Sequence, residues 1–259
     1  MQQSKSMTII WTALAGLLIL ACTGTEIGNP QDDEESEVSV QVQGLDRGTS
    51  GALTLTNGIE FEEAWLVLED VEFRSGQECE ETIATDFDAI NAVELVSGIE
   101  YPGYDMTLLP ASSYCRFAIQ LDEVELDDLP SGAPEELAEL SILVRGKSPA
   151  GIPFEVRYDD SERLEFHGRF TLAPPAQSLF TVFALNEWLT PEQLQKADDG
   201  TSETIVIDDD TNTDLLEDFL AALQTSGILV RDENDDGILQ DSELDFPLAR
   251  GDALLIGDD

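Results

Sequence analysis

The chain has 259 residues, of which 55 are Asp or Glu and 12 are Lys or Arg, so its formal net charge is −43 at pH 7. Its 42% hydrophobic residues are enough for one core, or for one core with an appendage. Such an acidic surface repels phosphate backbones and anionic lipid headgroups, which disfavours nucleic-acid binding and peripheral adhesion to membranes. Two explanations fit this negative charge. The protein could come from a saline habitat, where salt screens the repulsion between its carboxylates, or it could be an ordinary exported protein rich in acidic residues.

Residues 1–21 have the pattern of a signal peptide. Lys5 precedes an uncharged run from Met7 to Ala21, which is shorter than the roughly 20 residues that a membrane-spanning helix needs. The sequence ILAC that ends at Cys22 resembles the lipobox of bacterial lipoproteins. This resemblance implies that Cys22 is lipidated on sulfur and becomes the mature N-terminus. The alternative is a secretory signal with a chance cysteine.

Residues 22–36 are expected to form a disordered acidic tether, because Gly, Pro and a run of acids leave too little apolar material for a core. The opening CTGTEIGNP resembles the start of a group of uncharacterised Gram-negative bacterial lipoproteins that begin Cys-x-Gly-Thr-Glu-x-Gly-Asn-Pro. A fainter likeness extends through EEAWLVLEDVEF, SILVRGKSPAGIPFEV and an acidic loop near the C-terminus. The resemblance implies a lipid-anchored protein of the cell envelope. Thr23 stands where Asp would mark inner-membrane retention, which favours the outer membrane and leaves the leaflet open.

Residues 37–189 alternate apolar and polar side chains, as β-strands do. Val38, Val40 and Val42 show the pattern in VSVQVQ. In EAWLVLEDVEF the apolar parity slips near Asp70, which indicates a β-bulge. About nine strands are expected, with a hairpin around 147–151 and no helices between strands. The predicted fold is therefore mainly β, an antiparallel β-sandwich rather than a parallel α/β sheet.

Residues 190–259 are expected to form a small helical segment that carries a calcium-binding loop. Thr190, Pro191 and Gln193 have the types of an N-cap, a first helical residue and a capping-box partner. A second helix, TDLLEDFLAALQTSG, is expected to end at Gly227. Its apolar residues share one face, which we expect to pack on the sandwich rather than on a partner: Leu215, Leu216, Phe219, Leu220 and Leu223.

The remaining cysteines and the histidine bear on redox and catalytic chemistry. With Cys22 lipidated, Cys79 and Cys115 are left as a pair, and an oxidising compartment favours a disulfide between them. The sequence contains no Cys-x-x-Cys redox pair. His167 is the only histidine and lies in an alternating strand, which favours a structural or solvated role over a catalytic one. Zinc is disfavoured because few N and S ligands remain.

The segment DENDDGILQDSE has the spacing of an EF-hand calcium loop, with Gly237 at the sixth position for the turn and Leu239 as apolar anchor. The alternative is a solvated acidic turn. Because Gly227 and Pro247 leave little room for the paired helices of a sensor, a structural calcium site is expected. A weaker echo at residues 208–214 has Thr213 in place of Gly and more simply caps the second helix. The expected calcium ligands are Asp232, Asn234, Asp236, the Ile238 carbonyl and Glu243.

Together these patterns predict a membrane-anchored extracytoplasmic lipoprotein that acts as a structural or binding module with a structural calcium site. The sequence does not identify its protein or glycan partner and assigns no catalytic residue. The alternative is an envelope or surface glycan hydrolase that uses paired carboxylates. A deep pocket with convergent carboxylates and aromatic side chains would favour the hydrolase, and a filled sandwich would favour the module.

Overall fold

The computed structural model describes residues 35–45, 52–76, 79, 81–85, 90–103, 107–197, 200 and 203–251. The expected signal peptide, Cys22 and nearly all of the expected tether lie outside the described residues. None of the described helices is long and apolar enough to span a membrane. The helices, including two 3-10 turns, are η1 (Glu135–Leu137), η2 (Leu185–Glu187), α1 (Pro191–Ala197), α2 (Thr213–Ser226) and α3 (Asp241–Leu244).

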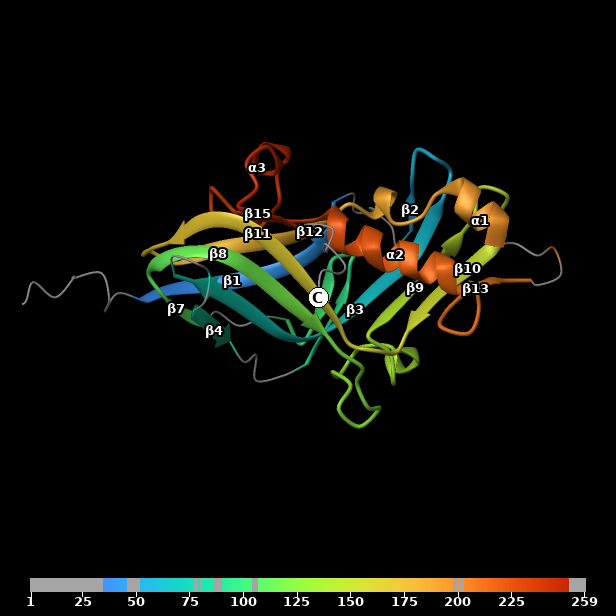
Figure 1. Ribbon diagram of the computed structural model, residues 1–259, viewed down its shortest axis with the longest axis horizontal. Coiled ribbons are helices and arrows are strands. Elements are labelled where there is room, and N and C mark those ends of the chain that lie inside the picture. The colour runs from blue at the N-terminus through green and yellow to red at the C-terminus, as the bar shows by residue number, and fades with distance from the viewer. Residues whose placement is uncertain are drawn as a thin grey trace, which may run out of the picture.

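The described residues form a 15-stranded sheet with the order β13-β10-β9-β3-β8-β11-β15-β14-β12-β1-β7, and β2, β4 and β5 pair with β3 off this path, while β6 pairs with β5. Figure 1 shows β9, β10 and β13 at one end of the molecule and β8, β11, β12 and β1 at the other. The strands are β1 (Glu35–Gly44), β2 (Leu53–Thr54), β3 (Glu60–Ser75), β4 (Glu81–Thr85), β5 (Asn91–Glu94), β6 (Ile99–Tyr101), β7 (Thr107–Pro110), β8 (Ser112–Leu121), β9 (Ile142–Lys147), β10 (Pro153–Tyr158), β11 (Glu162–Leu172), β12 (Gln177–Phe183), β13 (Ile205–Ile207), β14 (Gly227–Arg231) and β15 (Ala249–Gly251).

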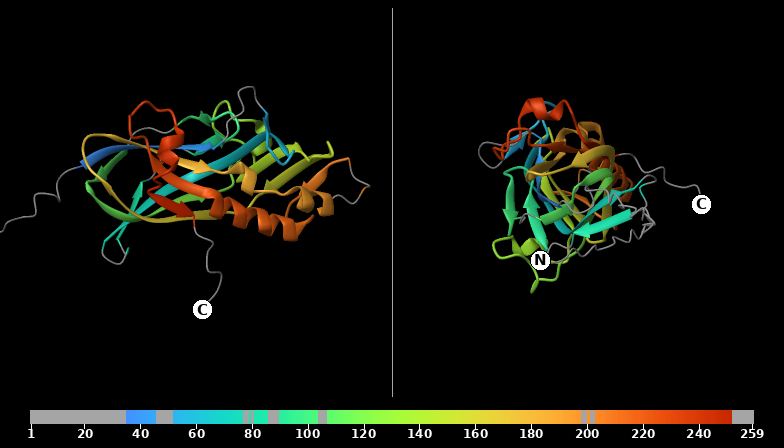
Figure 2. Two further views of the ribbon diagram at one scale, coloured as in Figure 1. Left: turned by 90° about the horizontal axis from the view of Figure 1, so that it is seen from above. Right: turned by 90° about the vertical axis from the view of Figure 1, so that its left-hand side faces the viewer.

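The prediction of a mainly β fold is confirmed, but a sandwich of two antiparallel sheets is not. The described strands join one sheet, and two of its pairings, β1 with β12 and β10 with β13, are parallel. Strands β13, β14 and β15 come from the expected C-terminal segment, so this segment shares the sheet with the preceding residues. The end-on view in Figure 2 shows the strands wrapping round a common interior.

The sheet curls until its distant parts meet. The Gly44 N–H at the end of β1 donates to the Leu95 carbonyl at 3.1 Å, and the Leu95 N–H donates to the Ala64 carbonyl of β3 at 2.8 Å. β3 itself kinks where the register of its pairing with β8 shifts between Leu68 and Asp70, which confirms the predicted bulge. The Asp70 carboxylate accepts the Val71 N–H at 2.7 Å, so the bulged backbone keeps a partner.

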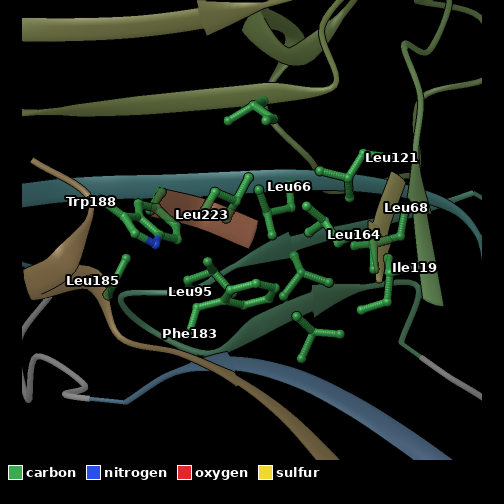
Figure 3. Packing of buried hydrophobic residues seen from close by; sticks show 14 of the residues in the cluster. Leu66, Leu68, Leu95, Ile119, Leu121, Leu164, Phe183, Leu185, Trp188 and Leu223 are labelled. Atoms are coloured by element: carbon green, nitrogen blue, oxygen red, sulfur yellow. The ribbon is translucent and has the colours of Figure 1, made fainter. Parts of the chain in front are cut away.

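The interior is filled by apolar side chains from the sheet and from α2. Trp188 is 1% exposed and packs edge-to-face on Phe219 of α2, with ring centroids 5.4 Å apart. Its indole N–H donates to the Ser226 hydroxyl at 2.8 Å, so the buried polar atom is satisfied. Figure 3 shows Trp188 gathered with Leu223 and with side chains of the sheet. The expected Leu-rich face of the second helix therefore packs on the β core, as predicted.

The local helix signals are also present. The Thr190 N–H donates to the Gln193 side chain at 2.9 Å, and the Gln193 N–H donates to the Thr190 hydroxyl at 3.3 Å, so the predicted capping box is formed. α2 ends at Ser226, and Gly227 continues directly into β14 with extended backbone. A Cβ at Gly227 would lie 2.5 Å from the Phe166 ring. This close approach explains the glycine, which serves tight packing in place of a left-handed helix end.

Cys79 and Cys115 form the predicted disulfide, with Cα atoms 5.8 Å apart and a sequence separation of 36. The bond joins the segment that follows β3 to β8, the strand paired with β3. It therefore closes a loop that contains β4, β5, β6 and β7. In the chain-entropy account, such a loop stabilises the folded protein by about 3 to 4 kcal/mol.

We expect the double variant Cys79→Ala/Cys115→Ala to lose about 3 kcal/mol of unfolding free energy, because the unfolded chain regains the entropy of the open loop. Urea denaturation of the variant and of the oxidised wild type measures this loss. Reduced wild-type protein is the matched control and should show a similar loss. Identical denaturation midpoints for oxidised and reduced wild type would contradict a stabilising bridge.

An ion-pair network covers the outer face of β3, β8 and β11. The Glu72 carboxylate accepts from Arg74 at 2.5 Å and from Arg163 at 2.8 Å. Burial by itself raises the pKa of Glu72, but the hydrogen bonds and charges of the two arginines outweigh it and lower the pKa below its usual value. Since the folded-state pKa is depressed, the contribution of Glu72 to stability is present above its unfolded-state pKa and is lost as the pH falls through the folded-state pKa.

We expect Glu72→Gln to reduce the unfolding free energy at pH 7 by about 1 to 2 kcal/mol, and to reduce it much less at acid pH, below the lowered folded-state pKa of the wild-type carboxylate. Denaturant titrations at both pH values give the comparison. Glu62→Gln is the control, because Glu62 is 45% exposed in its pair with Lys147 and such pairs contribute little. An equal deficit for Glu72→Gln at both pH values would rule out the ionised carboxylate as the cause.

Candidate functional site

The predicted calcium loop follows β14, includes the first three residues of α3 and stands out from the sheet (Figure 1). Its first residue is fixed by the Asp232 N–H, which donates to the Ser178 carbonyl of β12 at 2.9 Å. Near its end, Leu239 and Leu244 pack on a small apolar cluster on the outer face of the sheet, formed by Phe180, Val182 and Val230. Both ends of the loop are therefore held by the same part of the sheet, and Leu239 is an apolar anchor as expected.

The backbone of the loop winds round the Asp232 carboxylate. Its Oδ1 accepts the N–H groups of Asn234 and Asp236, both at 3.3 Å, and its Oδ2 accepts the Gly237 N–H at 2.7 Å. Gly237 has a φ of +70°, in the left-handed region that favours glycine. The sixth position therefore requires the residue type that the sequence pattern predicts there.

Glu243 folds back onto the start of the loop. Its Oε1 accepts the Glu233 N–H and its Oε2 accepts the Gln240 N–H, each at 2.9 Å. Asp232 is 3% exposed and Glu243 is 4% exposed. Within the described part of the chain, no ion pair includes either carboxylate. Two carboxylates are thus buried near each other with only neutral N–H groups as partners, an arrangement that a cation would stabilise.

The remaining expected ligands lie on the open side of the loop. Asn234 and Asp236 are exposed, and the Ile238 side chain is 64% exposed. The Asn234 side chain accepts the Asp236 N–H at 3.0 Å, and the Asp236 carboxylate accepts the Ile238 N–H at 2.8 Å. Among the described residues, no three His, Cys, Asp or Glu side chains are gathered as a metal-binding group. The carboxylates expected as ligands here accept hydrogen bonds from the loop's own N–H groups.

The donor set nevertheless fits calcium. A carboxylate offers about four lone-pair positions, and the Glu243 carboxylate accepts one hydrogen bond on each oxygen. Calcium takes oxygen ligands from carboxylates, amides and backbone carbonyls, which are the groups that this loop carries. Binding would require the side chains to turn toward a common centre and to give up part of their N–H bonds. That cost is consistent with weak affinity.

The weaker echo near α2 is a turn in this structure. The Asp208 carboxylate accepts the N–H groups of Asp210 and Thr211 at 3.1 and 2.6 Å. Asn212 is the N-cap of α2, with no side-chain bond to the helix. Its side-chain amide instead donates to the Val206 carbonyl of β13 at 2.6 Å. The segment therefore ties the helix start to the sheet.

An acidic pocket that the sequence does not predict lies among the loops at the β9–β10–β13 end. Its volume is about 640 Å³. Burial raises the pKa of the nearby Glu69, and the neighbouring Asp122 raises it further by charge repulsion and a hydrogen bond. Arg157 is the only cation and no aromatic side chain is among the described residues that line it, which are Asp122, Glu123, Val124, Glu125, Ala138, Glu139, Leu140, Arg157, Asp159, Asp208 and Asp209.

His167 lies on the outer face of the sheet, where its Nε2 is 3.7 Å from the Glu165 carboxylate. Its side chain is 36% exposed. Its cross-strand neighbours are Arg116 of β8 and Arg250 of β15. His167 is thus part of neither the predicted calcium loop nor the described lining of the acidic pocket, and its neighbours are charged side chains.

Comparisons with models of known protein families, with curated proteins and with solved structures found no match to this chain. The buried carboxylates of the loop, the acidic pocket and the sequence motif at Cys22 are therefore the observations that bear on function.

Proposed function

We propose that the chain is an extracytoplasmic lipoprotein, anchored to the outer membrane through Cys22, which acts as a structural or binding module. The signal pattern that ends at Cys22 supports the anchor. Strand β1 begins at Glu35, so a segment of about a dozen residues would separate the lipid from the sheet. At roughly 3.3 to 3.6 Å per extended residue, such a tether lets the sheet stand up to about 40 Å from the membrane surface.

The observation that carries the cofactor proposal is the burial of Asp232 and Glu243 without a cationic partner among the described residues. They occupy the first and twelfth positions of the EF-hand-like spacing. We propose that calcium binds there, with Asn234, Asp236 and the Ile238 carbonyl completing the site. The incoming element is strand β14 and α3 has four residues. This geometry supports a static clip, since the opening of a sensor depends on two paired helices.

The module is favoured over the glycan hydrolase expected as the alternative. The acidic pocket gathers carboxylates, as the hydrolase reading requires, but its described lining contains no aromatic ring and little apolar surface. Small-molecule and sugar sites are usually lined by both. The well-filled interior of the curled sheet agrees better with a scaffold that presents loops to a protein or glycan partner.

The lipid anchor is tested with Cys22→Ser. We expect the variant to incorporate no labelled fatty acid and to appear in the soluble fraction, because the acyl chains supply the membrane affinity. Cys79→Ser/Cys115→Ser is the matched control and should remain with membranes. Unchanged membrane fractionation of Cys22→Ser would show that something other than this cysteine anchors the protein.

The calcium site is tested by the thermal stability of wild type and Glu243→Gln with calcium or chelator. We expect a dissociation constant of about 10⁻⁴ to 10⁻³ M and, at tenfold higher calcium, an added stability of about 1.4 kcal/mol. Glu243→Gln should remove most of this calcium-dependent increment. Each variant is compared with itself in chelator, so the loss of the backbone bonds of Glu243 does not imitate a loss of calcium binding.

Asp235→Asn is the matched control for the calcium site. It removes one charge from the same loop at an exposed position outside the ligand set, and Asn tolerates the φ of +54° found there. The control should keep most of the calcium response. If neither millimolar calcium nor chelator changed the wild-type melting temperature, the loop would be a solvated acidic turn and not a calcium site.

A further inference from the structure

Four residues that can carry positive charge form one row across the outer face of the sheet. Arg74 of β3 is paired with Arg116 of β8, Arg116 with His167 of β11, and His167 with Arg250 of β15. Directly paired residues of neighbouring strands point to the same face. Their inward-facing neighbours Phe73, Phe117, Phe166 and Ala249 are buried in the core, which places these four side chains outside. We call them the basic row.

The basic row is unexpected in this chain, both because basic residues are rare in it and because neighbouring like charges are unfavourable. Only 12 of the 259 residues are Lys or Arg, and like charges that lie directly opposite each other destabilise a sheet. Elsewhere on the same sheet the charges alternate: Arg145 of β9 lies between Glu63 of β3 and Glu155 of β10 and binds them at 2.8 and 2.6 Å. If the basic row were only a solvent-exposed set of charges that stabilises the sheet, we would expect acidic and basic residues to alternate across the strands, as they do around Arg145.

The carboxylates of the adjacent row balance the arginines only in part. Glu72 binds Arg74 at 2.5 Å, and Glu165 binds Arg116 at 3.2 Å. Both carboxylates also bind Arg163 of β11, at 2.8 and 3.1 Å. Among the described ion pairs of this network, two carboxylates thus serve three guanidinium groups, and Arg250 joins the row without an ion pair to any described residue. Within this network of described residues, positive charges outnumber carboxylates.

Donors remain open in the basic row. The Nε atom of Arg116 has no hydrogen-bond partner among the described residues but is buried. The donors that a ligand can reach belong to the exposed Arg250 and to the part-exposed guanidinium groups of Arg74 and Arg116. A guanidinium carries five N–H donors in a planar fork that matches anionic oxygens. Several such forks from neighbouring strands suit a group that can accept from more than one of them at once. Phosphate, with three or more acceptor oxygens, meets this requirement better than a planar carboxylate.

We propose that the basic row is a binding site for a small phosphate-bearing ligand. Neighbouring strands lie about 4.8 Å apart, so the row spans about 14 Å, which gives room for two linked phosphate groups. The net charge of −43 repels long polyanions more strongly than short ones, because the repulsion grows with the charge of the ligand. The site therefore favours a short anion over a nucleic acid or an anionic polymer.

Isothermal titration of the full mature chain with pyrophosphate, at constant ionic strength, tests the proposal. We expect saturable binding by the wild type, and about tenfold weaker binding by Arg116→Gln and by Arg250→Gln, which each remove a guanidinium from the row. Arg250 is exposed, so its variant is expected to fold even where Arg116→Gln does not. Circular dichroism checks the fold of each variant.

Arg145→Gln is the matched control: it removes the same charge from the same sheet, at a position already neutralised by two glutamates. Its affinity for pyrophosphate should equal that of the wild type. Absence of saturable binding by the wild type, or an equal loss in Arg145→Gln, would overturn the proposal. Citrate, titrated in parallel, distinguishes the ligand chemistry, and binding as tight as that of pyrophosphate would overturn the assignment to phosphate.

Discussion

The backbone hydrogen bonds along the two edges of β3 are the constraint on which the rest of the structure depends. The first half of this strand pairs with β9 and the second half with β8, while β2, β4 and β5 pair with its other edge. The Asp70 bulge lies close to the change from one partner to the next. One continuous strand thus joins the β9–β10–β13 arm, which borders the acidic pocket, to the curled arm that carries the predicted calcium loop and the basic row.

Local features of this fold could be predicted from the sequence, because they depend on residues close together in the chain. The alternation at Val38, Val40 and Val42, the capping box at Thr190 and the parity slip at Asp70 are of this kind. The single sheet could not be predicted. Its parallel pairing of β1 with β12 joins segments far apart in the chain, and the alternation of each strand reports which side is buried but not which strand is its neighbour. Many short alternating strands therefore suggested a sandwich.

The candidate sites also differ in how far they could be predicted, because some are formed by neighbouring residues in the chain and others by distant ones. The predicted calcium loop is contiguous, so the need for glycine at position 237 could be predicted, although the burial of Asp232 and Glu243 depends on packing against β12 and β14. The acidic pocket and the basic row are assembled from several strands and loops. In a sequence rich in acids, Asp122 and Asp208 give no local sign that they share a cavity. Arg74 and His167 likewise become neighbours only through the register of β3, β8 and β11.

The parallel pairing of β1 with β12 also sets the order in which the chain can fold. β1 is made first among the described strands, yet β12, which pairs with residues 38–44 of β1, is completed only when Phe183 has been synthesised. Folding is slow when pairings are so distant in sequence, and until then the edge of β1 that pairs with β12 is open to other chains. The abundant carboxylates have a use during this interval, because their mutual repulsion keeps partly folded copies apart. The acidity of the chain thus protects the partly folded protein from association during the time that its topology needs to pair β1 with β12.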